Sequence, residues 1–250
     1  MPSRPLNRLV GAGVSVVLMV GTAACSAGGQ APQAPPEPVT VLFDQGRVSA
    51  SLQTAPEHVP VEGLVLVIGG SPADDYVVES RSLLAEAGFA SLVVEGAEDL
   101  GPLKTREILA AAAADTRGDP VPQAVLAFGH SGDMGWSLSS GDVGVAFIVS
   151  CPLPEGVFDF ESLKNTSVRA VFAQDGDVYR TSYERAHVPM RDIPTPHDFL
   201  VYGNGITDDF YDRSSTTFHE ATWNATRDAM IEWFDLFLRG RPGPSGDHGH

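Results

Sequence analysis

The sequence predicts an α/β fold, a three-layer α/β/α sandwich around a mostly parallel central sheet. Two observations lead to this prediction. Short apolar runs typical of buried strands alternate with segments of helical periodicity, and such alternation requires crossover connections between parallel strands. In addition, 250 residues with 43% hydrophobic residues are enough for one large core. We place this single domain at residues 40–240.

The first elements of the domain are a hairpin, a buried strand and a helix. Residues 39–43 and 47–52 are strand-like and flank a turn that contains Gly46, which predicts an antiparallel hairpin. Residues 64–68 are continuously apolar, as expected for a strand buried on both faces. Residues 74–88 have helical spacing, with acidic residues at the start and glycine at the end, and predict a helix.

The alternation continues to the end of the domain. Further strands are predicted at residues 91–94, 124–128, 145–149, 168–173 and 199–202. Helices are predicted at residues 103–116, directly after residue 128, and in a long final segment that ends at Leu238. The segment between the last two strands is expected to be irregular.

The first residues have the pattern of an export signal. Two arginines precede an apolar run at residues 9–20, which is too short to span a bilayer as an ordinary helix, and small residues follow it. We therefore predict a signal peptide at residues 1–24. Residues 25–39 are rich in proline and predict a flexible tether. The tail at residues 241–250 has no apolar residue and is expected to be disordered.

The two cysteines have different predicted roles. Thr22-Ala-Ala-Cys25 resembles the lipobox of bacterial lipoproteins. The resemblance implies that Cys25 is lipidated and anchors the exported protein to the bacterial cell membrane, although Thr22 stands where Leu or Val is more common. Secretion with an unmodified Cys25 is the alternative. Cys151 follows an apolar run, so a buried, inert thiol is expected there, with a nucleophile as the alternative.

The charge of the chain excludes one class of partner. With 16 Lys+Arg against 32 Asp+Glu, the net charge is −16, and no basic cluster offers a site for phosphate backbones. Nucleic acid is therefore not expected as a partner. No Gly-x-Gly-x-x-Gly follows the first parallel strand, which argues against a dinucleotide site. His248 and His250 are too few for a metal site, and no cofactor or metal is expected.

The sharpest chemical signal is Gly129-His130-Ser131-Gly132-Asp133, which leaves a predicted strand and enters a predicted helix. Gly-x-Ser-x-Gly in that context is a nucleophile elbow, whose small residues let the backbone turn and project the serine above the sheet. The amide of Gly132 can then face a developing oxyanion. Asp133 departs from this pattern. His130 is expected to be structural, because adjacent residues on a sharp turn point apart. A helix-capping role for Ser131 is the alternative.

From this motif onward the chain resembles the α/β-hydrolase superfamily and, within it, the dienelactone-hydrolase-like enzymes. The similarity lies in element order and in short motifs at residues 64–70, 84–90, 169–177 and 199–205. It implies a hydrolase for a small-molecule ester or related acyl bond. By this resemblance Ser131 matches the nucleophile, where many dienelactone hydrolases have Cys.

The resemblance also implies an oxyanion region and an acid. Gly132 and the turn that contains Gly70 and Ser71 match the oxyanion region. Asp177 matches the acid that orients the base, and it follows a predicted strand at the edge where working residues collect. Asp175, two residues earlier, could do the same work, and a solvated turn is the alternative for both.

The base is the missing part of this pattern. The family has a His a few residues after the last strand, whereas residues 202–210 contain none. Thr207 cannot act as a base near neutral pH, and Asp208 and Asp209 are expected to be solvated. His219, just before the final helix, is the best replacement. Its alternative role is that of a first-turn helix residue facing water.

Two functions of different classes follow. The first is a cell-envelope α/β-hydrolase in which Ser131, Asp177 and His219 are catalytic. The second is a lipoprotein that keeps the hydrolase scaffold as a binding or structural module after loss of the catalytic His. The retained Gly-His-Ser and Gly-Asp motifs favour the first, while Asp133 and the missing His favour the second. The pattern indicates neither the identity of the substrate nor an oligomeric state.

Overall fold

The fold is built on one sheet with an antiparallel half and a parallel half. The structure, a computed structural model, describes residues 15–17, 37–43, 46–56, 59–115, 121–141 and 143–239. The strands in this part are β1 (Ser15–Val17), β2 (Glu37–Phe43), β3 (Gly46–Gln53), β4 (Gly63–Ile68), β5 (Phe89–Val94), β6 (Gln123–Phe128), β7 (Val145–Val149), β8 (Ser167–Ala173) and β9 (His197–Tyr202). They pair in the order β1-β2-β3-β5-β4-β6-β7-β8-β9.

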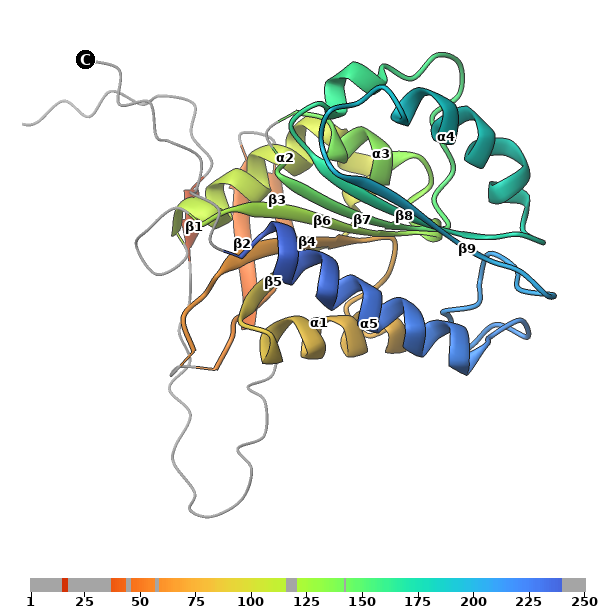
Figure 1. The fold of residues 1–250 in the computed structure, drawn as a ribbon. Helices are drawn as coiled ribbons and strands as arrows, with labels where there is room; N and C mark the ends of the chain where they lie inside the picture. Colours follow the sequence, from red (N-terminus) through yellow and green to blue (C-terminus); the bar gives the residue numbers. More distant parts are fainter. Residues whose placement is uncertain are drawn as a thin grey trace, which may run out of the picture.

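The parallel half of the sheet carries the helices. From β5 through β4, β6, β7 and β8 to β9 every neighbouring pair is parallel, whereas β1, β2, β3 and β5 pair antiparallel. The helices are α1 (Asp75–Glu86), α2 (Ala97–Asp115), α3 (Met134–Ser139), α4 (Glu184–Met190) and α5 (Glu220–Phe237). Helices α1 and α5 cover one face, and α2, α3 and α4 cover the other (Figure 1). The predicted three-layer α/β sandwich is confirmed.

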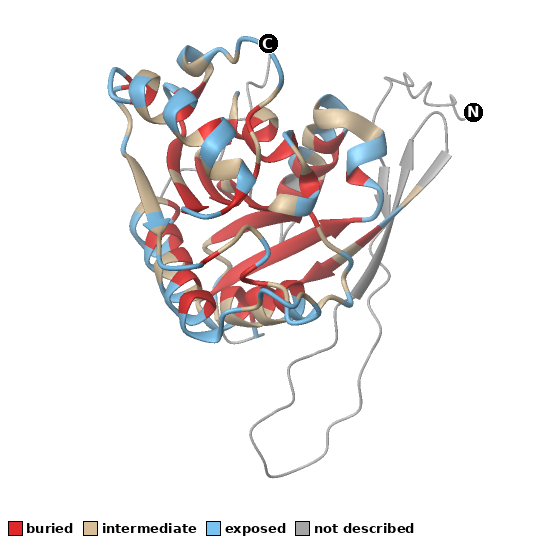
Figure 2. Ribbon diagram, turned by 90° about the vertical axis from the view of Figure 1, so that its right-hand side faces the viewer, coloured by how far each residue is buried: buried red, intermediate tan, exposed pale blue. Residues whose placement is uncertain are grey.

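Both faces of the central strands are buried, which explains their continuous apolar sequence. In β4, Leu64 and Leu66 pack into a core with α2, while Val65 and Val67 pack into a second core with α1 and α5. Figure 2 shows the central strands buried and exposed residues on the outer sides of the helices. Each large apolar side chain buried in this way contributes about 1.5–3 kcal/mol, so these two cores hold the carboxyl ends of the strands in fixed positions.

The structure corrects the prediction for the segment between β8 and β9. This segment was expected to be irregular, yet it contains a π-helical stretch at Tyr179–Tyr183 that leads into α4. A π turn shifts the helical period, and Pro189 lies inside α4, so the 3.6-residue pattern is hidden in the sequence.

Helix α2 also differs from its prediction. It is broken at Gly101, whose φ of 74° and ψ of 166° are not helical. The predicted helix matches the part after this break, where Pro102 suits a first helical position. The part before the break begins at Ala97 and was not predicted.

The N-terminal predictions concern residues that are largely outside the described part of the chain. Strand β1 lies within the predicted signal peptide and pairs with β2, which itself begins inside the predicted tether. Cys25, the remainder of the predicted signal peptide and the tail at 241–250 are outside the described residues. Within the described ranges, no helix combines the length and the apolar character needed to cross a membrane.

Candidate active site

Ser131 lies on a tight turn between a buried strand and a helix, as predicted. Strand β6 ends at Phe128, a 3₁₀ turn spans Gly129–Ser131, and α3 starts at Met134. Gly132 adopts a φ of 57° and a ψ of −134°, a conformation that only glycine adopts readily. A Cβ at Gly129 would lie 2.8 Å from the carbonyl oxygen of Ser150, so the turn also packs closely against the end of β7.

Asp133 fits this turn in spite of its departure from the motif. Its backbone is right-handed, with a φ of −80° and a ψ of −4°, and its side chain is exposed. Glycine is not required in that conformation. The substitution therefore leaves the geometry of the strand–turn–helix unit intact.

The Ser131 hydroxyl contacts the thiol of Cys151. The Oγ–Sγ distance is 3.5 Å, and both residues are buried, with 4% and 1% of their surfaces exposed. Burial raises the pKa of Cys151 to about 12, so the thiol is protonated near neutral pH. The expectation that the Cys151 thiol is buried is confirmed.

Two of the three predicted oxyanion amides already have partners. The Gly132 amide donates to the carbonyl of Gly129 at 3.0 Å, and the Ser71 amide donates to Oδ2 of Asp74 at 2.7 Å. The Gly70 amide has no acceptor among the described residues. Only the Gly70 amide is therefore free for a substrate oxygen without rearrangement of the turns.

Asp177 and His219 have contacts of their own, away from Ser131. The Asp177 carboxylate is 92% exposed and pairs with Arg180 at 3.2 Å. His219 is the N-cap of α5, where its Nδ1 accepts from the amide of Thr222 at 3.3 Å. No hydrogen bond in the described part of the chain joins either residue to Ser131.

A second contact of the His219 ring is closer than the capping one. Nδ1 lies 2.8 Å from the hydroxyl oxygen of Thr222, and the tautomer of the ring decides which of the two atoms donates. In a serine triad an acid holds Nδ1–H and Nε2 is the base. At His219 both contacts of Nδ1 are with Thr222, so a threonine stands where a triad has its acid.

Asp208 corrects the expectation of a solvated carboxylate. Its Oδ2 accepts from the amide of Val178 at 3.1 Å, and its Oδ1 is buried against Gly176. Burial raises the pKa of Asp208, while the backbone hydrogen bonds from Val178 and Asp177 act in the opposite direction. The loop in which the resemblance implies a His thus supplies a carboxylate that caps the helical segment after β8.

A cavity of about 380 Å³ lies at the carboxyl ends of the parallel strands. Its walls include the turn at residues 69–72 together with Asp74, Tyr76, Glu95, Glu98 and His130. A second hollow of about 260 Å³ shares Asp74, Tyr76 and His130 and adds Asp75, Asp212 and Ser214. Acidic side chains line the cavity and the second hollow. His130, which directly precedes Ser131, lines both of them.

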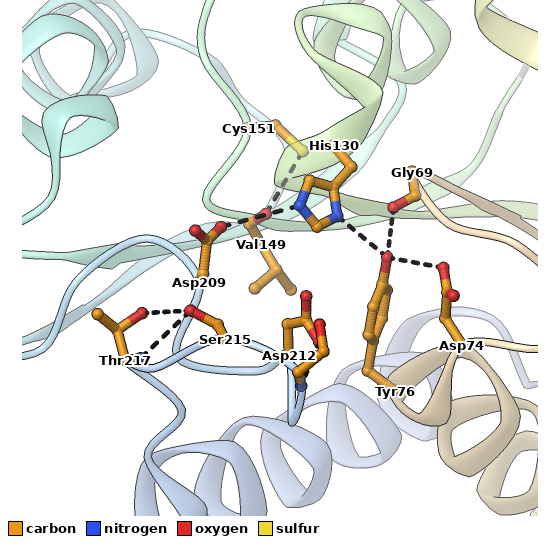
Figure 3. Close-up of polar contacts among 11 residues, drawn as sticks. Gly69, Asp74, Tyr76, His130, Val149, Cys151, Asp209, Asp212, Ser215 and Thr217 are labelled. Atoms are coloured by element: carbon orange, nitrogen blue, oxygen red, sulfur yellow. Dashed lines mark hydrogen bonds and ion pairs between the residues drawn. The ribbon is translucent and has the colours of Figure 1, made fainter.

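His130 is the residue that the sequence interpretation missed. Its Nδ1 lies 3.1 Å from the hydroxyl of Tyr76, and its Nε2 lies 4.0 Å from Oδ1 of Asp209 (Figure 3). The Tyr76 hydroxyl also lies 2.8 Å from the carbonyl of Gly69 and 3.4 Å from Asp74. The side chain was expected to be structural, yet it is half-exposed in the wall of the cavity.

Metal ligation has no visible basis in this region. The part of the chain that the structure describes contains no group of three or more His, Cys, Asp or Glu side chains placed to hold a metal ion. The side chains that line the cavity carry hydroxyls, carboxylates and the imidazole of His130.

Comparison with known proteins supports the fold. No protein-family model and no curated protein matches the chain, but solved structures do. A protein described as a dienelactone hydrolase from Klebsiella pneumoniae subsp. pneumoniae aligns with a TM-score of 0.62 and 15% identity over 77% of this chain and 95% of its own. A dienelactone hydrolase-like promiscuous phosphotriesterase from metagenomic libraries aligns with a TM-score of 0.63 and 16% identity over 78% and 94%. A serine hydrolase without a lid from Xanthomonas campestris aligns with a TM-score of 0.56 and 14% identity over 84% and 100%.

The chain has the α/β-hydrolase fold. In this fold the nucleophile stands on the turn between a central strand and the following helix. Ser131 occupies that turn between β6 and α3. The motif at residues 129–133 therefore lies between a strand and a helix, as predicted.

Proposed function

We propose that this protein is a cell-envelope serine hydrolase that cleaves an ester or related acyl bond of a small molecule. The observation that carries the proposal is the position of Ser131 on the strand–turn–helix unit of an α/β-hydrolase fold, beside a cavity that has an imidazole in its wall. The names of the similar structures, which include a dienelactone hydrolase and a serine hydrolase, support the same chemistry.

The reaction has two balanced halves. The Ser131 oxygen bonds to the carbonyl carbon while its proton passes to a base, and the tetrahedral intermediate then expels the alcohol, which takes that proton. Water attacks the acyl-enzyme in the same way, releasing the acid and restoring the Ser131 hydroxyl. The developing oxyanion would be met by the Gly70 amide and, after opening of the turn, by that of Gly132.

Labelling with a fluorophosphonate probe tests this proposal. We expect the purified protein to form an adduct at Ser131, and Ser131→Ala to abolish labelling and to lower turnover of a short activated ester by about 10⁴- to 10⁶-fold. Ser137→Ala, in the next helix, is the matched control and should label normally. An adduct at another residue, or a Ser131→Ala protein that still turns over ester, would contradict the proposal.

A second function is favoured by specific contacts. The amides of Ser71 and Gly132 are already bonded within the protein, Asp177 points into solvent, and Asp208 caps a helix. These contacts suit a hydrolase scaffold that has become a binding module. In that case the wild-type protein would not label with the probe, and a small neutral ester would raise the melting temperature without being consumed.

Export and lipid attachment complete the proposal, and they rest on the sequence of residues 1–25. A lipid on Cys25 would hold the domain at the bacterial membrane, and secretion without the lipid is the alternative. A hydrolase in this compartment would meet its substrates outside the cytoplasm.

A further inference from the structure

We propose that Cys151 is a positioning residue for Ser131: its sulfur accepts the hydrogen bond of the Ser131 hydroxyl and holds the nucleophile in a resting conformer that does not reach the cavity. This inference rests on the proposed serine-hydrolase function and adds to it a means of control at the same site. It gives a role to a buried thiol that the proposed reaction does not otherwise use.

The direction of the contact follows from the single proton of the thiol. The Cys151 thiol donates to the carbonyl oxygen of Val149 at 3.5 Å, and a carbonyl oxygen can only accept (Figure 3). Toward Ser131 Oγ, also at 3.5 Å, the sulfur therefore presents a lone pair. The Ser131 hydroxyl must be the donor in this contact, and it has no second partner among the described residues.

Burial keeps the thiol in the protonation state that this arrangement requires. Cys151 is 1% exposed, and burial raises its pKa to about 12, so the sulfur carries its proton near neutral pH. The thiolate, not the thiol, is the nucleophilic form of cysteine. Cys151 therefore does not compete with Ser131 for an acyl group.

Packing fixes the position of the sulfur. The carbonyl oxygen of Cys151 accepts from Trp136 Nε1 at 3.1 Å, and the Trp136 side chain is fully buried. In the first turn of α3, a Cβ on Gly135 would lie 3.2 Å from the sulfur, which is closer than an ordinary van der Waals contact. The sulfur is thus enclosed between the end of β7 and α3, and it has little room to follow the Ser131 side chain when that side chain moves.

The Ser131 hydroxyl lies behind the cavity wall in this conformer. Ser131 is 4% exposed, and among the described residues the walls of the cavity and of the second hollow do not include it. Its backbone is close to the wall, because a Cβ on Gly69, which lines the cavity, would lie 2.8 Å from the Ser131 amide nitrogen. Serine has three staggered rotamers, so the oxygen can change its direction without a movement of the backbone.

The reaction requires that the contact with Cys151 break. A serine becomes nucleophilic when a base within hydrogen-bond reach takes its proton. In the resting conformer this proton points at a neutral thiol sulfur, which is a weak acceptor and no base. Only the fraction of molecules in which Ser131 has left the sulfur is competent, and this fraction scales the observed rate.

The rate of fluorophosphonate labelling at Ser131 tests the hold on the nucleophile. In Cys151→Ala the hydroxyl loses its acceptor, and we expect labelling about 2- to 10-fold faster than in the wild type, the range that corresponds to one ordinary neutral hydrogen bond. A merely structural loss of packing would not accelerate labelling. Val125→Ala is the matched control, because it removes methyl groups from the same core without touching Ser131 or Cys151, and it should label as wild type. Unchanged or slower labelling of folded Cys151→Ala would overturn the inference.

The S–H stretching band in the Raman spectrum measures the contact without relying on activity. The chain has two cysteines, so in the full-length Cys25→Ser protein the Cys151 thiol gives the only band. Ser131→Ala in this background should shift the band to higher frequency, because a hydrogen bond that the sulfur accepts strengthens the one that it donates. Ser137→Ala is the control and should leave the band in place. An unshifted band in Ser131→Ala would overturn the inference even where Cys151→Ala fails to fold.

The two measurements separate this inference from the proposed function. Labelling that is absent from the wild type but present in Cys151→Ala would support the hold on Ser131. Normal wild-type labelling together with an unshifted band would keep Ser131 as nucleophile and overturn the role of Cys151. Absence of labelling in both proteins would refute the proposed function, and the Raman band would still decide whether the Ser131 hydroxyl bonds to the sulfur.

Discussion

Asp208 shows at the residue scale how a carboxylate in a loop can serve the backbone of a neighbouring segment. In the family that the chain resembles, this loop carries the catalytic His, which needs contact with the acid. Here the carboxylate turns to backbone amides at the start of the helix after β8. The chemistry of this contact is that of a helix cap.

The raised pKa of Asp208 predicts a pH effect on stability. A carboxyl whose pKa is higher in the folded state favours folding fully only below its unfolded pKa, and this contribution is lost as the pH rises through the raised value. Asp208→Asn keeps an oxygen acceptor for the Val178 amide and removes the buried charge. We expect the variant to be at least as stable as wild type at pH 7 and to lose less stability between about pH 4 and 7.

Melting temperatures measured across this pH range test the effect. Asp192→Asn, whose residue is exposed after α4, is the matched control and should leave the profile unchanged. A profile for Asp208→Asn that is as steep as that of wild type would contradict the assignment of the slope to this carboxyl.

Single residues also show what the sequence could reveal about the site. Ser131 was found because its signal is local, a Gly-x-Ser between an apolar run and a helix. His130 and Tyr76 are 54 positions apart, and their contact depends on how β4 and β6 pair and on where α1 begins. The role of Asp177 was inferred from the resemblance and from its position after a strand, and that of His219 from its position before the final helix. Position in a loop does not determine the direction of a side chain.

At the scale of elements, Glu79 on α1 joins the helices that cover one face of the sheet. Its carboxylate accepts from Trp223 Nε1 at 2.7 Å and pairs with Arg213 at 3.0 Å and Arg227 at 2.7 Å. These partners lie on α5 and on the loop that precedes it. The same loop carries Asp209 and Tyr211, so Glu79 helps to hold the contacts of His130 in place.

Replacement of Glu79 should loosen this loop. Burial alone would raise the pKa of Glu79, but hydrogen bonds from Trp223 and Arg213 outweigh it and lower the pKa. A lowered pKa gives stability that is present above the unfolded value and is lost as the pH falls through the folded value. We expect Glu79→Gln to lower the free energy of unfolding by about 1–3 kcal/mol at pH 7. In acid, where the Glu79 carboxylate of the wild type is protonated, this difference between the two proteins should disappear.

Urea unfolding and amide hydrogen exchange check the prediction for Glu79→Gln. Exchange should accelerate first in the loop before α5. Glu232→Gln is the control, because that carboxylate is 71% exposed in its pair with Arg169 and should change stability by less than about 1 kcal/mol. If the two variants lose the same free energy of unfolding, or if amide exchange in the loop before α5 is unchanged, the contacts of Glu79 do not organise this region.

Elements were predictable where one physical pattern dominated. The central strands are buried on both faces, so their apolar runs stand out in the sequence, and the predicted strand at 145–149 matches β7. The helical segment after β8 was missed because its π turn disrupts the period. The first part of α2 was missed because Gly101 separates it from the recognisable part.

At the scale of the whole molecule, the sheet order explains why the site lies where it does. The parallel strands β4, β5 and β6 are neighbours, so the loops after them meet at one edge and form the cavity wall. Folds of this type collect their working residues at that edge. The net charge of −16 is consistent with the carboxylates around the cavity and predicts weaker binding of anionic than of neutral or cationic esters.

The same net charge bears on attachment to the membrane. An acidic protein is repelled by anionic headgroups, so electrostatics cannot hold this domain at the surface. A lipid on Cys25 would supply the attraction, at about 0.8 kcal/mol for each buried CH₂. Cys25→Ser should therefore leave the membrane fraction and accumulate as an unprocessed or soluble secreted form, whereas Ser26→Ala should fractionate as wild type. Fractionation of cells expressing each variant tests this expectation, and a Cys25→Ser protein that stays with the membrane would contradict the predicted lipid anchor.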